Sequence, residues 1–158
     1  MNHLPALLAC SLLAASSNLT TAQPANRPTP AVGPEITPEL DQTIAKAINY
    51  LASTQSDDGS WEGGRFGKNV AITSLACLAF MGDGNTASRG PYSDHIMRGL
   101  RFVLDSTKEN GLITAEANNG PMYGHGFATL FLGEIYGMTG GGADTAISTQ
   151  IHESLVKA

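Results

Sequence analysis

The alternation of apolar and polar positions predicts five helical segments of two kinds. In residues 40–51 and 96–104, apolar residues recur every three or four positions and leave one face polar, as in an amphipathic helix. Residues 69–81 and 123–138 are apolar on most sides, which is typical of a helix buried by several neighbours. A fifth segment, again amphipathic, begins near Asp144. No stretch alternates with a period of two, so the expected fold class is all-α.

Short polar residues and glycines mark the expected helix ends. Thr37, followed by Pro38 and Glu39, has the composition of a helix start, and Ser93 is expected to cap the third segment. Gly82 is expected to end the second segment, and the glycines at 140–142 the fourth.

Residues 1–22 are predicted to be a signal peptide. Leu4–Ala15 is an apolar run too short to span a bilayer, and the small residues Thr20 and Ala22 precede a cleavage point after Ala22. Lipid attachment at Cys10 is the alternative. Residues 23–36 contain four prolines and are predicted to be an extended tether. We therefore expect a secreted or periplasmic protein without a membrane span, whose folded part is residues 37–158.

Charge and cysteine content narrow the functional classes. The chain of 158 residues has a net charge of −5 and no cluster of lysine or arginine, which argues against a nucleic-acid partner. Removal of the leader takes Cys10 with it and leaves Cys77 alone in an apolar stretch. Cys77 is therefore expected to be a buried structural thiol rather than half of a disulfide.

An internal repeat underlies the alternation of helices. Residues 46–61 and 98–113 align without gaps at an offset of 52, and residues 73–82 align with 128–137. The matched pairs of the first alignment are Lys46 and Arg98, Ala47 and Gly99, Ile48 and Leu100, Tyr50 and Phe102, Leu51 and Val103, and Gly59 and Gly111. A third unit opens at Lys157 and Ala158, which repeat Lys46 and Ala47.

The first copy resembles the QW motif of the prenyltransferase and squalene oxidase repeat, which occurs in squalene and hopene cyclases and in protein prenyltransferase β-subunits. The residues that match the motif are Lys46, Ala47, Tyr50, Leu51, Gln55, Gly59 and Trp61. In the second copy Thr107 stands in place of the glutamine and Ile113 in place of the tryptophan. The resemblance covers residues 37–158.

This resemblance implies an α/α toroid, in which outer helices surround inner helices that line a cavity. The chain would supply about two and a half helical-hairpin repeats of an incomplete barrel, so further C-terminal repeats are expected. The motif is structural in the family, and Gln55 is able to satisfy backbone groups at helix ends while Trp61 covers the turn. Asp57, Asp58 and Glu62 are either solvated turn residues or a metal or acid site.

The sequence offers three candidate catalytic residues, all within the apolar segment 123–138. Tyr123, His125 and Glu134 are the candidate catalytic residues, because polar groups on an inner helix face the cavity, although a structural role for His125 and Glu134 is the alternative. The Asp-x-Asp-Asp sequence of the cyclases and the Asp-x-Cys zinc ligands of the prenyltransferases are missing from this chain, so no cofactor or metal is expected. The resemblance implies binding or processing of an isoprenoid-like apolar ligand. The alternatives are a non-catalytic scaffold for a protein partner and a carbohydrate lyase on the same architecture.

Overall fold

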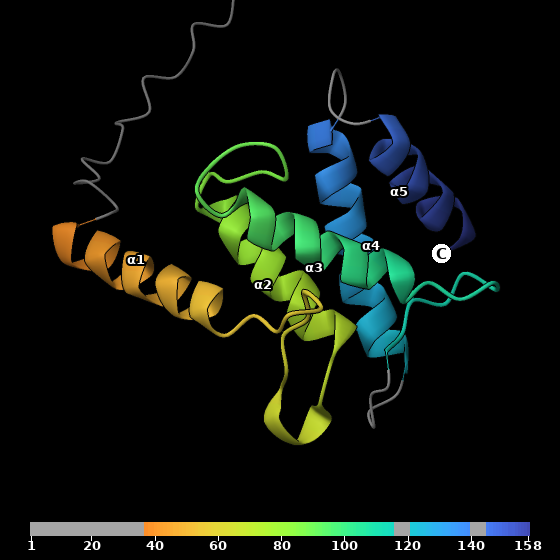
Figure 1. The fold of residues 1–158 in the computed structure, drawn as a ribbon, viewed down its shortest axis with the longest axis horizontal. Helices are drawn as coiled ribbons and strands as arrows, with labels where there is room; N and C mark the ends of the chain where they lie inside the picture. Colours follow the sequence, from red (N-terminus) through yellow and green to blue (C-terminus); the bar gives the residue numbers. More distant parts are fainter. Residues whose placement is uncertain (1–36, 116–120, 140–144) are drawn as a thin grey trace, which may run out of the picture. The chain divides into compact units, whose positions relative to one another are not determined.

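A computed structural model describes residues 37–115, 121–139 and 145–158, and within these ranges the regular structure is helical (Figure 1). The elements are α1 (Pro38–Ser53), the 3-10 turn η1 (Gly64–Phe66), α2 (Val70–Gly82), α3 (Ser93–Asp105), α4 (Pro121–Thr139) and α5 (Thr145–Lys157). Extended residues in the described ranges form isolated bridges rather than strands. The all-α prediction is confirmed. The predicted signal peptide and tether and the glycines at 140–142 lie outside the described residues.

Of the two helix caps predicted from the sequence, Thr37 is confirmed and Ser93 is wrong. The Thr37 hydroxyl accepts a hydrogen bond from the Leu40 amide at 3.3 Å, and Pro38 is the first residue of α1. The Asn69 side chain, which was not predicted as a cap, caps α2 by accepting from two backbone amides. Ser93 lies inside the first turn of α3, with its amide bonded to Gly90 O at 3.2 Å, because the N-cap position is that of Tyr92.

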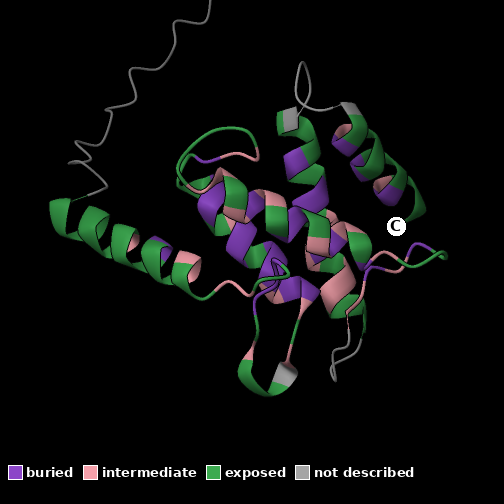
Figure 2. Ribbon diagram, viewed as in Figure 1, coloured by how far each residue is buried: buried purple, intermediate pink, exposed green. Residues whose placement is uncertain are grey.

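The buried residues are concentrated on α2 (Figure 2). Eight residues of α2 are buried, namely Val70, Ala71, Thr73, Ser74, Ala76, Cys77, Phe80 and Met81, whereas α1 buries Ile48 alone. This confirms the prediction that residues 69–81 are enclosed on several sides. For residues 123–138 the same prediction is wrong, since α4 buries Ala128, Phe131, Leu132 and Ile135 but leaves much of its surface exposed.

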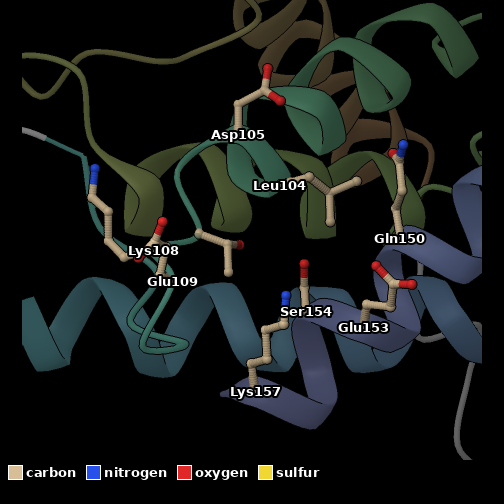
Figure 3. A pocket seen from close by; sticks show the side chains of 9 residues that line it. Leu104, Asp105, Lys108, Glu109, Gln150, Glu153, Ser154 and Lys157 are labelled. Carbon is tan, nitrogen blue, oxygen red and sulfur yellow. The ribbon is translucent and has the colours of Figure 1, made fainter.

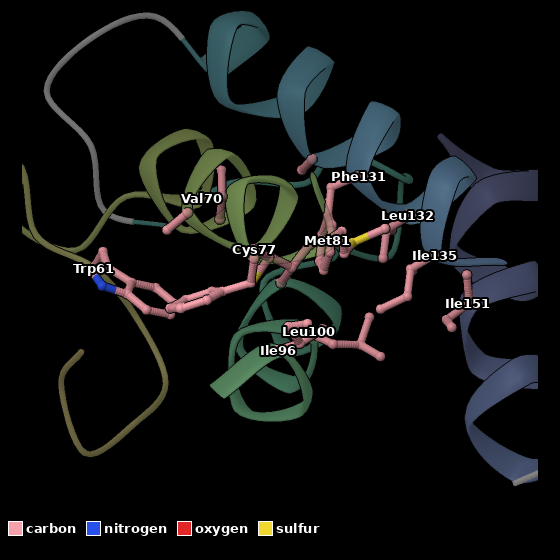
Figure 4. Packing of buried hydrophobic residues seen from close by; sticks show 14 of the residues in the cluster. Trp61, Val70, Cys77, Met81, Ile96, Leu100, Phe131, Leu132, Ile135 and Ile151 are labelled. Carbon is pink, nitrogen blue, oxygen red and sulfur yellow. The ribbon is translucent and has the colours of Figure 1, made fainter. Parts of the chain in front are cut away.

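The difference between α2 and α4 follows from their neighbours. Helix α2 packs against α1, α3 and α4, whereas α4 packs against α2 and α5. Figure 4 shows the resulting core, in which Cys77 and Met81 of α2 lie between Leu100 of α3 and Leu132 of α4. Each large aliphatic side chain buried there stabilises the fold by about 1.5–3 kcal/mol. The core is therefore shared by α2, α3 and α4 rather than belonging to one pair of helices.

Candidate functional site

The side chain of Gln55 connects the turn after α1 to the beginning of α3. Its Nε2 donates to Gly59 O and to His95 O, both at 3.0 Å. Its Oε1 accepts from Arg98 Nη2 at 2.5 Å and lies 2.7 Å from His95 Nδ1. Gln55 was expected to satisfy backbone groups at helix ends, and it binds a turn carbonyl together with His95 O in the first turn of α3. One amide thus holds the turn after α1 on α3.

Trp61 closes the same turn from the inside. The indole is 3% exposed and packs on Phe80, with ring centroids 5.9 Å apart. Its Nε1 donates to Leu51 O at 2.9 Å, and its amide donates to Thr73 Oγ1 at 3.0 Å. Trp61 therefore joins the end of α1 to the first turns of α2. These contacts account for a large aromatic residue in this turn without a role in ligand binding.

The turn formed by residues 106–113, here called the second turn, repeats the backbone geometry of residues 54–61, the first turn. Ser56 N donates to Ser60 O in the first turn, and Lys108 N donates to Leu112 O in the second, each at 2.9 Å. These bonds are 52 residues apart, the offset found in the sequence. In each turn an Asp or Asn side chain, Asp58 or Asn110, also accepts from the amide two residues later, each at 3.2 Å. The repeated sequence therefore forms a repeated structure.

His125 occupies the structural position of Thr73. Thr73 accepts from the Trp61 amide, and His125 Nδ1 accepts from the Ile113 amide at 3.2 Å, again 52 residues later. Because Nδ1 is an acceptor, the neutral ring carries its proton on Nε2. The described contacts thus give His125 a part in holding the second turn on α4.

The other two candidates on α4 lie on its exposed surface. Tyr123 is 75% exposed and packs its ring against Phe127, with centroids 5.5 Å apart. Glu134 is exposed as well. Tyr123, His125 and Glu134 are not linked to one another by any hydrogen bond among the described residues. The structure therefore assembles no acid–base pair from these three positions.

Helices α2 and α4 match in burial at a different offset from the turns. The buried residues Thr73, Ala76, Cys77 and Phe80 align with Ala128, Phe131, Leu132 and Ile135 at an offset of 55. The turn contacts of Thr73 and His125 require an offset of 52. The two offsets differ by three residues, which is nearly one helical turn. Helix α4 therefore presents almost the same face at either offset.

The acidic residues of the first turn are arranged as turn residues. Asp58 accepts from the amide and the hydroxyl of Ser60 and pairs with Lys68 at 2.5 Å. The hydrogen bond from Lys68 lowers the pKa of Asp58 from its usual value, and that from Ser60 acts in the same direction. Asp57 and Glu62 are exposed. Within the described residues no three His, Cys, Asp or Glu side chains are grouped as metal ligands would be.

Cys77 is enclosed between α2 and α3. Its side chain has no exposed surface, and burial raises the pKa of the thiol to about 12. A Cβ built on Gly99 would overlap its Sγ, so the two helices cross at their closest point here. Cys77 is thus the buried structural thiol that the sequence indicates. The residue at the repeat position shared by Ala47 and Gly99 must be small where a second helix crosses it, as α2 crosses α3 at Gly99.

His95 is the residue of this site that the sequence did not single out, and Arg98 appeared there only as the repeat partner of Lys46. His95 stacks on Phe80 at 5.8 Å between centroids, and burial lowers its pKa, as does the charge of Arg98. The sequence signal for Arg98 is that it repeats Lys46 and, like Lys46, precedes a small residue. His95 had no such signal, since it meets Gln55 only after α3 has folded against the first turn.

Comparisons with models of known protein families, with curated proteins and with solved structures find no match. Among the described residues, no helix has both the length and the apolar character that crossing a membrane requires.

Proposed function

We propose that this chain is a helical-repeat protein of the α/α-toroid kind that binds an isoprenoid-like apolar ligand along its inner helices. The order of packing supports this arrangement. Helices α2 and α4, which would be inner, pack on each other, while α3 and α5, which would be outer, also touch. Each inner helix is followed by an outer helix that packs on it. The repeated turns join one outer helix to the next, as an array with one repeating step requires.

The observation that carries the proposed ligand is an apolar strip on the inner helices. We use this name for the exposed residues at helical spacing, which are Leu75, Ala79 and Gly82 on α2 and Met122, Gly126, Leu130, Gly133 and Gly137 on α4. Leu75 and Leu130 are 45% and 51% exposed and occupy equivalent positions at the offset of 55. Repetition of an exposed leucine on both inner helices supports a shared apolar surface rather than chance exposure.

Glycines make the α4 part of this strip suited to a flat or extended apolar molecule. A Cβ built on Gly126, Gly133 or Gly137 would meet no atom within 4 Å. Without side chains there, a ligand is able to approach the helix backbone closely. The strip residues themselves carry no ionisable group, although the exposed Glu134 lies one helical turn from Leu130 on α4. An apolar lining favours hydrocarbon over a sugar. We include no reaction in the proposal, because the described candidates form no acid–base pair.

Binding of farnesol to the full chain tests the proposal. Burial of one leucine side chain contributes about 1.5–3 kcal/mol, so Leu130→Glu is expected to weaken farnesol binding at least about 10-fold in calorimetric titration. Leu40→Glu is the matched control, since Leu40 is 44% exposed on α1, away from the strip. Saturable binding that only Leu130→Glu weakens would support the proposal. No saturable binding, or equal loss in both variants, would overturn it and favour the protein-scaffold alternative.

A further inference from the structure

A polar groove lies between α3 and α5, outside the apolar strip. It has a volume of about 310 Å³, at the lower end of the range for small-molecule sites. Its lining includes Thr107 and Lys108 of the second turn and Glu153, Ser154 and Lys157 of α5. Figure 3 shows the side chains of Ser154 and Lys157 directed from α5 toward α3 and the second turn.

This groove is the second repeat's counterpart of the space that Gln55 fills in the first. A Cβ on Gly59 would overlap Arg98 O, and a Cβ on Gly111 would overlap Lys157 O, so Lys157 stands where Arg98 stands. His95 lies three residues before Arg98 and Ser154 three residues before Lys157, so Ser154 is at the position equivalent to His95. Thr107 replaces Gln55 itself.

The shorter side chain leaves Ser154 and Lys157, which stand in the positions of two partners of Gln55, lining the groove. Thr107 Oγ1 lies 3.5 Å from Val103 O of α3 instead of reaching α5. Gly111, the counterpart of Gly59, is buried and does not line the groove. Ser154 O accepts from Ala158 N at 3.1 Å and keeps a second lone pair, as His95 O does for Gln55. Lys157 supplies a cation in place of Arg98.

Charges at the rim of the groove have both signs. Asp105, Glu109 and Glu153 offer carboxylates and Lys108 and Lys157 offer ammonium groups. Such a rim suits a ligand that itself carries an ammonium group and a carboxylate, because each charge finds an opposite partner.

We propose that the groove binds a primary carboxamide on a short stem, either free L-glutamine or a glutamine side chain of a partner peptide. The amide nitrogen donates to Ser154 O, and the amide oxygen accepts from Lys157 Nζ. The ligand thus repeats the contacts that Gln55 makes with His95 O and Arg98 in the first repeat. This inference is independent of the proposed apolar ligand.

Titration of the full chain, followed by NMR, with L-glutamine, N-acetyl-L-glutamine methylamide and L-glutamate tests the proposal. Glutamate is the matched control, because its carboxylate has no N–H to donate to Ser154 O. We expect saturable shifts at Thr107 and Ser154, with glutamine or its capped form binding at least about 10-fold more tightly than glutamate. Binding of the free amino acid alone identifies a metabolite site, and binding of the capped form identifies a peptide site.

Variants at position 107 provide the second arm. Thr107→Gln is expected to place its own amide in the groove, to abolish binding of the added carboxamide and to raise the melting temperature. Thr107→Ser is the control that keeps the groove open and is expected to bind like the wild type. No saturable shift with either glutamine compound, equal binding of glutamate, or unchanged binding by folded Thr107→Gln would overturn the proposal.

Discussion

Gly59 lies so close to the carbonyl oxygen of Arg98 that no side chain fits between the first turn and α3. Gly59 also has φ +87°, a backbone conformation that costs other residues free energy. Gly111, at φ +85°, stands in the same relationship to Lys157. These two contacts set how closely the first turn approaches α3 and the second turn approaches α5.

Gly59→Ala is expected to destabilise the fold by about 2–4 kcal/mol, because it combines an unfavourable φ with a clash against backbone. Gly84→Ala is the matched control, since Gly84 has the same φ of +87° but no atom within 4 Å of a built Cβ. It is expected to cost about 1 kcal/mol from the backbone conformation alone. Urea denaturation measures both. Equal losses in the two variants would show that the approach to Arg98 is unimportant.

Gln55→Ala is expected to lower the free energy of unfolding by about 1.5–3 kcal/mol. It leaves Arg98 without its acceptor and the carbonyls of Gly59 and His95 without this donor. The exposed Gln42 of α1 provides the control Gln42→Ala, for which a change within about 0.5 kcal/mol is expected. Thermal unfolding of both variants measures the difference. If Gln55→Ala melts with the wild type, Gln55 does not connect the repeats.

Gly99→Ala is expected to destabilise the crossing of α2 and α3 by about 1–3 kcal/mol, since the new methyl group meets Cys77 Sγ. Cys77→Ala removes that sulfur and creates space. The double variant is therefore expected to be more stable than the sum of the single changes predicts, by at least about 0.5 kcal/mol. A double-mutant cycle in urea measures this coupling. If the free-energy changes of the two single variants add exactly, the new methyl group at position 99 does not clash with Cys77.

Stability is expected to fall with acidification through His95. Burial and the Arg98 charge lower the pKa of His95 in the folded state, whereas Asp94 acts in the opposite direction. The unfolded chain therefore takes up the proton first. The contribution of neutral His95 is complete above the unfolded pKa of about 6.5 and is lost as the pH falls from there toward the lower folded pKa. The other side chains that face the ring are those of Gln55, Phe80 and Tyr92.

His95→Asn removes this titration and is expected to flatten the dependence of the urea midpoint on pH below about 6.5. A series of urea melts across that range compares it with the wild type. If the two proteins lose stability in parallel, another group is responsible.

Helix positions and the repeated turns could be predicted from the sequence because they depend on local spacing and capping. Thr37 and Pro38 begin α1 for that reason. The exposure of Glu134 and the bridge from Gln55 to His95 could not be predicted, since both depend on which helices meet after folding. The place of Ser93 inside α3 depends on a bond to Gly90 in the preceding turn, which a capping preference does not reveal. Residue periodicity marks an apolar face but not whether a neighbour covers it.

Methyl NMR of the full chain titrated with farnesol tests the apolar strip most directly. Leu75 of α2 and Leu130 of α4 are the exposed leucines of the strip. A ligand bound along the strip is expected to contact both. We predict saturable shifts of the methyl resonances of Leu75 and Leu130 with a common dissociation constant, while Leu40 of α1 stays unchanged. Unchanged Leu75 and Leu130 resonances, or shifts of the same size at Leu40, would contradict the proposal that the inner helices bind an apolar ligand.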